Sequence, residues 1–350
     1  MVWNGSTSDT TQVSRLGLQK GGSTNRELFL KQFAGEVLTS FEEKNIFMPL
    51  HRVRTISSGK SAQFPSIGTV SAAYHSAGQT ILGDSVDHGE TTVTVDDLLV
   101  SATFIPKIDE AMNHYDVRST YSKEMGNALA NAADKNIAKV IADSAVFTQP
   151  TGGDQAGSWA DGDFTGFGGA STGGVIDMNG GSGTVNVFTS AELVDSVFKA
   201  LELFDKNDVT GEKFLVVSPQ AYYELFNNAQ STIMDRDFGG NGSNALGQAP
   251  TIGGVKVLMS NHIPNTNEST SADSATPTAA SGYGDYTGDY TGLQGLIFTK
   301  DAAATVKLLD LGVESEYQID RQGTLMVAKY AMGHNKLRGK GAIQLVASGT

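Results

Sequence analysis

The chain has 350 residues and a formal net charge of −13, and it contains no cysteine. This length is sufficient for a large core and two domains, whereas the lack of cysteine excludes disulfides, thiol nucleophiles and thiolate metal sites. The acidic balance argues against DNA binding by phosphate neutralisation, which needs clustered Lys and Arg. Glycine is frequent, at 41 residues, without a collagen-like period, which predicts long irregular excursions.

The first fifty residues predict a flexible arm followed by a helix. Residues 1–24 are polar and rich in Ser, Thr and Gly, which is typical of a segment without a packed core. The start lacks the features of a signal peptide, and no apolar run approaches the roughly 20 residues that cross a bilayer, so we expect a cytoplasmic product. The helix has one apolar face, formed by Leu30, Phe33, Ala34, Val37, Leu38 and Phe41.

Residues 51–106 carry the signals of a long, wide hairpin. A short β-prone run around Val53 and Ile56 ends at a Gly- and Ser-rich break. Residues 66–90 are rich in Gly, Ser and Asp, and the β-branched run that starts at Thr91 predicts the returning strand. A connection of this length inside a compact domain is uncommon, so we expect it to have a function.

The strongest helix signal covers residues 107–143. At about 1.5 Å per residue this segment spans roughly 50 Å, which is long for a globular helix and typical of a spine. Its predicted buried stripe has small residues at its centre. The stripe consists of Met125, Ala128, Leu129, Ala132, Ala133, Ile137, Val140 and Ile141.

The second half of the chain predicts a compact α/β unit after a glycine-rich excursion at 150–188. A capping box, Thr189-x-x-Glu192, opens an amphipathic helix, and a buried strand at 214–217 and a helix from Pro219 follow. Further strands are predicted at 296–298, 304–309, 324–330 and 342–346.

The segment 264–292 is predicted to be a surface insertion on the outer or peripheral side. It is rich in Ser, Thr, Ala and Gly and contains the repeat Gly284-Asp-Tyr-Thr-Gly-Asp-Tyr-Thr-Gly292. The tyrosines of such a repeat can stack on a glycan. A loop that tolerates changes of length is the favoured interpretation, because doubling a loop costs only about 0.6 kcal/mol.

The residue patterns predict no catalytic, cofactor-binding or metal-binding site. Gly59-Lys60-Ser61 resembles the end of a phosphate-binding loop, but Arg54 stands where that loop needs its first glycine. Asp161-Gly-Asp163-Phe-Thr-Gly166 opens like a calcium loop, but Thr172 replaces the required bidentate Glu.

The histidines and the clustered basic residues also give only weak evidence for a catalytic, metal-binding or nucleic-acid site. The histidines, at 51, 75, 88, 114, 262 and 334, lack the spacing of a zinc helix. The run Asn113-His114-Tyr115-Asp116 is better explained as the exposed face of the spine than as a base with an orienting carboxylate. The cluster Lys336-Leu-Arg338-Gly-Lys340 is too short for a nucleic-acid site and indicates a solvated turn or a donor of subunit salt bridges. We therefore do not expect an enzyme.

Five segments resemble the major capsid proteins of T7-like podoviruses, which are short-tailed phages with double-stranded DNA. They occur in the family's order, and two are long. No match is seen at 1–24, 150–188 and 264–292. The segments are Phe33–Thr39, Val53–Pro65, Ala111–Ser119, Thr305–Leu311, and Ala328–His334 followed by Leu337-Arg338.

The resemblance implies the α+β fold named after phage Hong Kong 97. Residues 1–50 would be the N-terminal arm and helix, and 51–106 the extended E-loop. Residues 107–188 and 296–350 would form the peripheral domain with its spine helix at 107–143. Residues 189–295 would form the axial domain, with 264–292 as its surface insertion.

The resemblance also implies a function in assembly. Subunits would form the hexamers and pentamers of an icosahedral shell, with a scaffolding protein, a portal protein and, as a further candidate, a decoration protein as partners. The shell would be assembled in the host cytoplasm and would enclose DNA without reading its sequence, since an acidic wall repels phosphate over roughly 8 Å. Lys60 lies where some wider relatives form a Lys–Asn cross-link, but the T7-like group is not expected to cross-link.

Two other functions stay open at this point. A bacterial nanocompartment shell shares the implied fold and encloses a cargo enzyme, although the T7-like segments argue against it. A secreted glycan-binding, adhesin-like β protein would fit the Gly-, Ser- and Thr-rich tracts, but the predicted helix at 107–143 argues against it.

Overall fold

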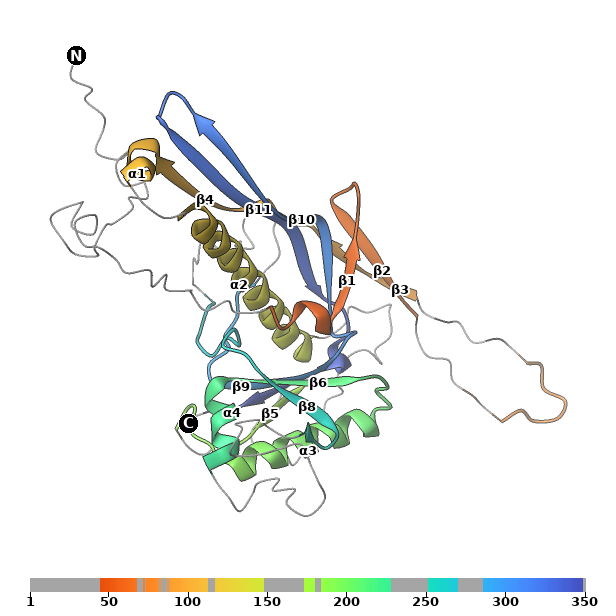
Figure 1. Cartoon of the computed structure of the whole chain (residues 1–350). Coiled ribbons are helices and arrows are strands. Elements are labelled where there is room, and N and C mark those ends of the chain that lie inside the picture. The colour runs from red at the N-terminus through yellow and green to blue at the C-terminus, as the bar shows by residue number, and fades with distance from the viewer. Residues whose placement is uncertain are drawn as a thin grey trace. The chain divides into compact units, whose positions relative to one another are not determined.

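The computed structural model describes most of the chain as a mixture of helices and sheets (Figure 1). The predicted N-terminal arm and helix, the glycine-rich run up to 172 and the centre of the 264–292 segment lie outside the described residues. The described residues are 45–67, 72, 74–81, 83, 86, 88–112, 117–147, 173–179, 184–227, 251–269 and 286–348.

Contacts divide the chain into two units. The described part of unit 1 comprises Asn45, Asp97–Ala133 and Leu309–Met332, and unit 2 comprises the rest. Helix α2 (Val117–Ala145) and strands β10 (Ala303–Gln318) and β11 (Gly323–Lys336) have residues in both units. In the described part of the chain, no helix has both the length and the apolar character needed to span a lipid bilayer.

Unit 1 contains parts of β10 and β11, a third strand and helical segments. Strand β4 (Leu99–Pro106) pairs antiparallel with β11, from Pro106 opposite Gly323 to Leu99 opposite Tyr330. Alternate residues of β11 are buried from Thr324 to Tyr330, as expected for a strand with one covered face. Helix α1 (Lys107–Met112) follows β4 directly, and its first amide donates to the Gln322 carbonyl at 3.0 Å.

The predicted spine is present as α1 and α2, and the junction at 113–116 lies outside the described residues. The predicted stripe is largely confirmed, because Met125, Leu129 and Ala133 are buried in unit 1 at four-residue spacing. Ala128 was wrongly placed on it, since it is exposed, and Ala132 is half-buried. The +3 positions therefore lie at the edge of the face, where a methyl group is not fully covered.

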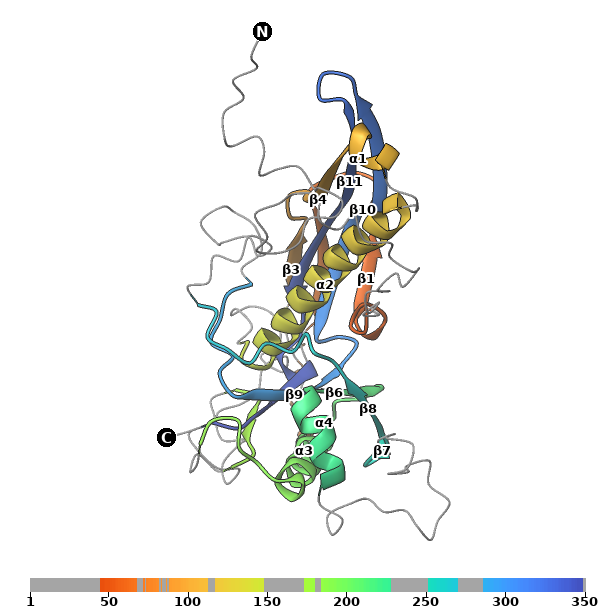
Figure 2. The ribbon, with the colours of Figure 1, turned by 60° about the vertical axis from the view of Figure 1, so that its left-hand side comes forward.

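Unit 2 contains a six-stranded sheet in the order β5-β12-β9-β6-β8-β7. Figure 2 shows α3 and α4 on one side of this sheet. The predicted capping box is confirmed, because the Thr189 and Glu192 side chains each accept from the other's backbone amide at the start of α3. The elements are β5 (Val175–Asp177), α3 (Ser190–Lys206), β6 (Lys213–Val217), α4 (Pro219–Asn227), β7 (Thr251–Ile252), β8 (Val255–Met259), β9 (Leu293–Thr299) and β12 (Ala342–Val346).

The sheet of unit 2 is covered on both faces, so its central strand is entirely buried. Leu215 and Ile297 belong to the core cluster that contains the apolar face of α3. Their neighbours Val216 and Phe298 belong to a second cluster with the C-terminal half of α2. All seven residues of β9 are buried, and its hydrophobic run is typical of a strand with two covered faces.

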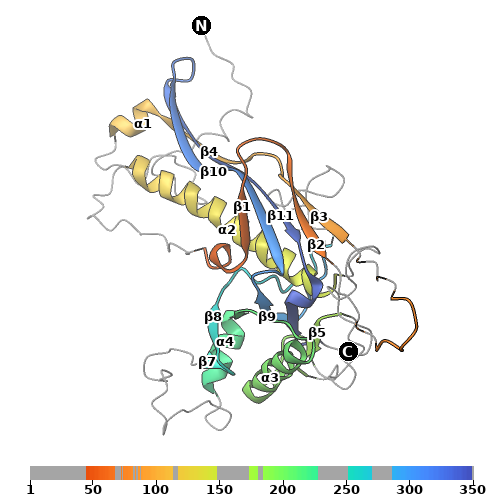
Figure 3. The same ribbon diagram turned by 90° about the vertical axis from the view of Figure 1, so that its right-hand side faces the viewer.

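A hairpin is present with the predicted returning strand near Thr91, but its outgoing strand begins at Ser61, and the predicted outgoing run around Val53 and Ile56 was wrongly placed in it. Strands β2 (Ser61–Ile67) and β3 (His88–Thr94) pair antiparallel, from Ser61 opposite Thr94 to Ile67 opposite His88 (Figure 3). The flanking strands belong to another sheet, because β1 (Arg52–Thr55) pairs parallel with β10 and β4 pairs with β11. We call β2, β3 and the residues between them the hairpin.

Candidate functional site at the base of the hairpin

Three of the segments that carry the sequence resemblance meet at the start of the hairpin, within unit 2. Val53 on β1 lies opposite Thr305 on β10. Gly333 and His334 on β11 also belong to this group, as does His51, which directly precedes β1. His51 and His334 are 283 positions apart in the sequence (334 − 51). We call Lys60 and Thr94–Asp96, which pack against these residues, the hairpin base.

Gly333 allows the backbone of the hairpin to approach β11 closely. A Cβ atom at this position would overlap the Thr94 carbonyl oxygen and lie 2.9 Å from the Cα of Val95. The Val95 amide donates to the Lys60 carbonyl at 2.7 Å, and the Asn335 side-chain amide donates to the Thr92 carbonyl at 3.0 Å. Backbone contacts therefore fix the hairpin at its base, and only glycine fits at position 333 without a shift.

Two buried histidines share one hydroxyl group beside this contact. His51 Nε2 lies 2.5 Å from Thr305 Oγ1, and His334 Nδ1 lies 2.7 Å from the same oxygen. The other nitrogen of His51, Nδ1, lies 2.8 Å from the Phe47 carbonyl oxygen. We call these three side chains the His–Thr–His array.

Burial makes both rings harder to protonate. Burial, with smaller effects from the charges of His51 and Lys307, lowers the pKa of His334 to about 3. The pKa of His51 is lowered by burial and, to a smaller extent, by Lys307, while the contact with the Phe47 carbonyl acts in the opposite direction. Both histidines are therefore neutral structural residues at neutral pH.

A buried tyrosine links the array to the hairpin. Tyr286 is 1% exposed, and its hydroxyl donates to Asp96 Oδ2 at 2.5 Å and accepts from the His334 amide at 3.1 Å. Tyr290 is 3% exposed and donates to Asp143 on α2 at 3.0 Å. The described ends of the 264–292 segment therefore correct the surface-insertion prediction, because both tyrosines of the repeat are core residues with carboxylate partners.

The C-terminal half of α2 carries polar side chains that each fix a different segment. Asp134 accepts from the Ile46 and Phe47 amides at 2.8 and 3.4 Å. Lys139 forms an ion pair with Glu268, and Ser144 lies 3.0 Å from the Ala302 carbonyl oxygen. This half of the helix is buried around most of its surface, so its polar groups need such partners.

Glu268→Gln is expected to destabilise the subunit by about 2–3 kcal/mol. The Lys139 side chain is 5% exposed, so loss of the carboxylate leaves a buried cation without its counter-charge. Thermal unfolding checks this. Glu314→Gln is the control, because the Glu314–Lys329 pair is exposed and is expected to contribute less than about 1 kcal/mol. Equal melting temperatures for Glu268→Gln and the unmodified chain would contradict the prediction.

The weak motif candidates of the sequence have structural explanations. Gly59, with φ of +101°, and Lys60 lie just before strand β2, whereas a phosphate loop leads into a helix. Lys336 lies over the Phe147 ring at 5.1 Å, and the Arg338 carbonyl lies 3.0 Å from Ser144 Oγ. The calcium-like run and His114 lie outside the described residues, among which no cluster of three potential metal ligands occurs.

The His–Thr–His array could not be found from the sequence. Isolated histidines beside strand-like runs are common, and the partners His51 and Thr305 are 254 positions apart.

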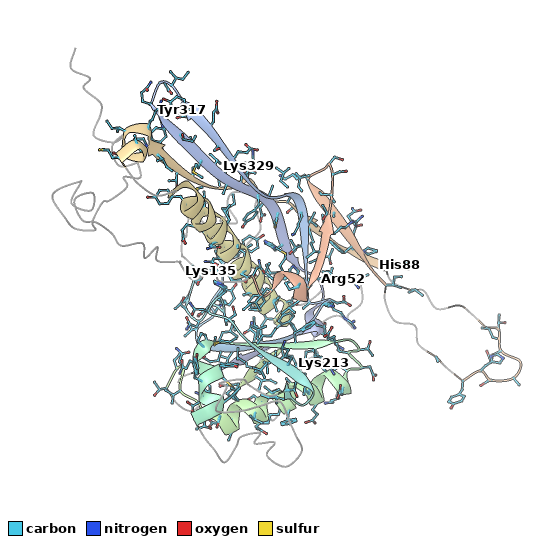
Figure 4. The ribbon with its side chains drawn as sticks, viewed as in Figure 1. Arg52, His88, Lys135, Lys213, Tyr317 and Lys329 are labelled. Carbon is cyan, nitrogen blue, oxygen red and sulfur yellow. The ribbon has the colours of Figure 1, made fainter. Side chains whose placement is uncertain are left out.

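Figure 4 shows Arg52 on β1 and His88 at the far end of β3 from the base. Arg52 contacts Asp301 at 2.6 Å in an exposed ion pair, which adds to the backbone pairing of β1 with β10.

Comparisons with known proteins agree with the sequence resemblance. The family model described as "Gp10A-like: Major capsid protein" matches residues 63–346. The major capsid protein of Escherichia phage T7 is 33% identical over 331 residues, which cover 90% of each chain.

Solved phage capsids share the fold. The capsid structure of Cyanophage P-SCSP1u matches with a TM-score of 0.73 and 39% identity, over 96% of this chain and 98% of that one. The mature capsid of bacteriophage PhiM1 matches with a TM-score of 0.69 over 97% and 98%, at 17% identity, and supports the fold alone. The predicted Hong Kong 97-type fold is therefore confirmed, and the chain belongs to the Gp10A-like family of phage major capsid proteins.

Proposed function

We propose that this major capsid protein forms the hexamers and pentamers of an icosahedral shell and that the hairpin is the arm that contacts a neighbouring subunit. In this proposal 51–106 is the E-loop, 107–188 and 296–350 the peripheral domain, 189–295 the axial domain and 1–50 the N-terminal arm and helix. Scaffolding, portal and decoration proteins are proposed partners, and assembly is proposed to occur in the host cytoplasm. The acidic net charge suits a wall that packed DNA does not adhere to.

The observation that carries the proposal is the small core of the hairpin. In the described strands β2 and β3, Ala62 and Val93 are the buried side chains, and both lie near the base. Ile67 is 66% exposed, and Tyr74 and Ile81 are fully or largely exposed. A strand pair of this kind is marginal alone, and its apolar residues become buried when it lies on a second copy.

A shortened hairpin tests the proposal. Replacing residues 65–90 with Asn-Gly joins Phe64 to Thr91, which are opposite residues in the ladder, through a two-residue turn suited to hairpins. The contact of Arg54 Nη1 with the Gln63 carbonyl, 3.1 Å in the full chain, is retained. We expect a soluble subunit with a native circular-dichroism spectrum that forms no shells in sedimentation or electron microscopy.

A full-length variant serves as the matched control. Tyr74→Ser with Ile81→Ser keeps the length of the hairpin and removes two exposed apolar side chains, so we expect shells in reduced yield. Normal shells from the shortened variant would contradict the role of the hairpin in assembly. An unfolded shortened variant would show that the hairpin belongs to the core of its own subunit.

A further inference from the structure

The hydrogen bonds of the His–Thr–His array have a defined direction. The Phe47 carbonyl can only accept, so Nδ1 of His51 carries a hydrogen, and in a neutral ring Nε2 is then an acceptor. The Thr305 hydroxyl therefore donates to His51 and accepts from Nδ1 of His334. The chain of donors runs from His334 through Thr305 and His51 to Phe47.

Added protons disrupt this order. A proton on His51 turns its Nε2 into a donor, so Thr305 must rotate toward His334, which must change its tautomer. A second proton makes both rings donors, which leaves the Thr305 hydrogen without a ring acceptor and places two cations on either side of one oxygen. Thr305 is 0% exposed, so water cannot accept the hydrogen bond that its hydroxyl has lost.

The carboxylates that the structure describes on the neighbouring segments are bonded to other groups. Lys307 follows Thr305 on β10 and carries the same sign of charge as a protonated ring. The Asp96 carboxylate is bonded to the Tyr286 hydroxyl, and the Asp134 carboxylate accepts from the Ile46 and Phe47 amides. Arg52, which directly follows His51, forms an ion pair with Asp301.

The array joins the two parts of the chain that fix the hairpin. His51 ends the turn that starts at Phe47, whose ring is 0% exposed and stacks on Phe298 at 6.1 Å between centroids. On the other side, His334 follows Gly333, the residue against which Thr94 and Val95 pack. Separation of His51 from Thr305 would release β1, and displacement of His334 would release the hairpin base.

We propose that the His–Thr–His array is an acid-releasable latch, which holds residues 46–55 and the hairpin base on β10 and β11 while both rings are neutral and releases them when the rings take up protons. The folded rings bind protons less readily than free histidine, so the open form binds more protons. The latch is therefore complete above the ordinary histidine pKa of 6.5 and weakens as the pH falls from there toward about 3. The open population should rise by up to about tenfold per pH unit for each ring that protonates on opening. This inference does not depend on the proposed role of the hairpin in assembly.

Hydrogen exchange of the full chain tests the latch. The protein is labelled at pH 7, 6, 5 and 4, and each labelling time is scaled to the intrinsic exchange rate of unprotected amides at that pH. We expect peptides covering 46–55 and 92–97 to lose protection below pH 6, while peptides from β9 stay protected. Constant protection at 46–55, or loss in step with β9, would overturn the proposal.

Three variants identify the group that titrates. His334→Asn keeps an amide donor near the position of Nδ1 but takes up no proton, so its opening should begin at lower pH. Lys307→Gln removes a charge that lowers the pKa of the closed rings, so the closed form should take up protons more readily and acid should open this variant less than the unmodified chain. His88→Gln, at an exposed position of β3, should match the unmodified chain. An unchanged profile in Lys307→Gln, or in a folded His334→Asn protein, would assign the effect to the carboxylates and overturn the latch.

Discussion

Leu129→Asp is expected to prevent folding of the subunit altogether. Leu129 is 3% exposed on the buried stripe of α2, so the new carboxylate would be placed among apolar side chains without a partner. Loss of the leucine packing alone costs about 2–5 kcal/mol, and burial of the charge adds several more. The sum is comparable with a typical stability of about 5–15 kcal/mol. Circular dichroism and the yield of soluble protein check this result.

Ala128→Asp provides the control at the adjacent position of the same helix. Ala128 is exposed, so a carboxylate there remains hydrated, and helix propensity lowers the stability by only about 0.7 kcal/mol. We expect this variant to fold. A native spectrum and normal yield for Leu129→Asp would show that this part of α2 does not contribute to the core.

Gly333→Ala is expected to have the second largest effect, because it adds one methyl group where two backbones meet. The new Cβ would overlap the Thr94 carbonyl oxygen and lie 2.8 Å from its carbon, so β11 and the hairpin base must separate. The shift would strain the bonds of His334 to Thr305 and to Tyr286. Overpacking of this kind costs about 1–3 kcal/mol or more, and we expect a subunit with a lower melting temperature that forms no regular shells.

Gly312→Ala is the matched control, since it lies on β10 with no atom within 4 Å of an added Cβ. It is expected to melt at or slightly above the temperature of the unmodified chain, because alanine reduces the freedom of the unfolded state. Unchanged melting and normal shells for Gly333→Ala would mean that the two backbones are not in close contact.

The elements with local signals could be predicted from the sequence. The capping box at Thr189 and Glu192 locates the start of α3 within one residue, because its two hydrogen bonds join residues three positions apart. The returning strand of the hairpin, β3, could be predicted from the β-branched run that starts at Thr91, whereas its partner β2 was not predicted. The family could be inferred because several segments matched in the same order.

The features that depend on distant partners could not be predicted. Tyr286 and Tyr290 lie in a polar repeat that resembles a loop in composition, but their hydroxyls bind Asp96 and Asp143, which are 190 and 147 positions away. The flanking strands β1 and β4 were assigned to the hairpin, because their pairing with β10 and β11 leaves no local signal. The order of the strands in the sheet of unit 2 could not be predicted either, because pairing between distant strands leaves no local signal.

The position of β12 in the sheet of unit 2 affects the order in which the chain can fold during translation. β12 (Ala342–Val346) pairs with both β5 and β9, so it lies between strands made well before it. Ala342 lies 165 positions after Asp177 (342 − 177), and at about 5–20 residues per second this stretch takes roughly ten to thirty seconds to synthesise. Until residue 346 has left the ribosome, β5 and one edge of β9 lack their partner strand. A nascent chain is therefore expected to complete this sheet only after nearly all of its length has been made, which delays association of unfinished subunits on the same polysome.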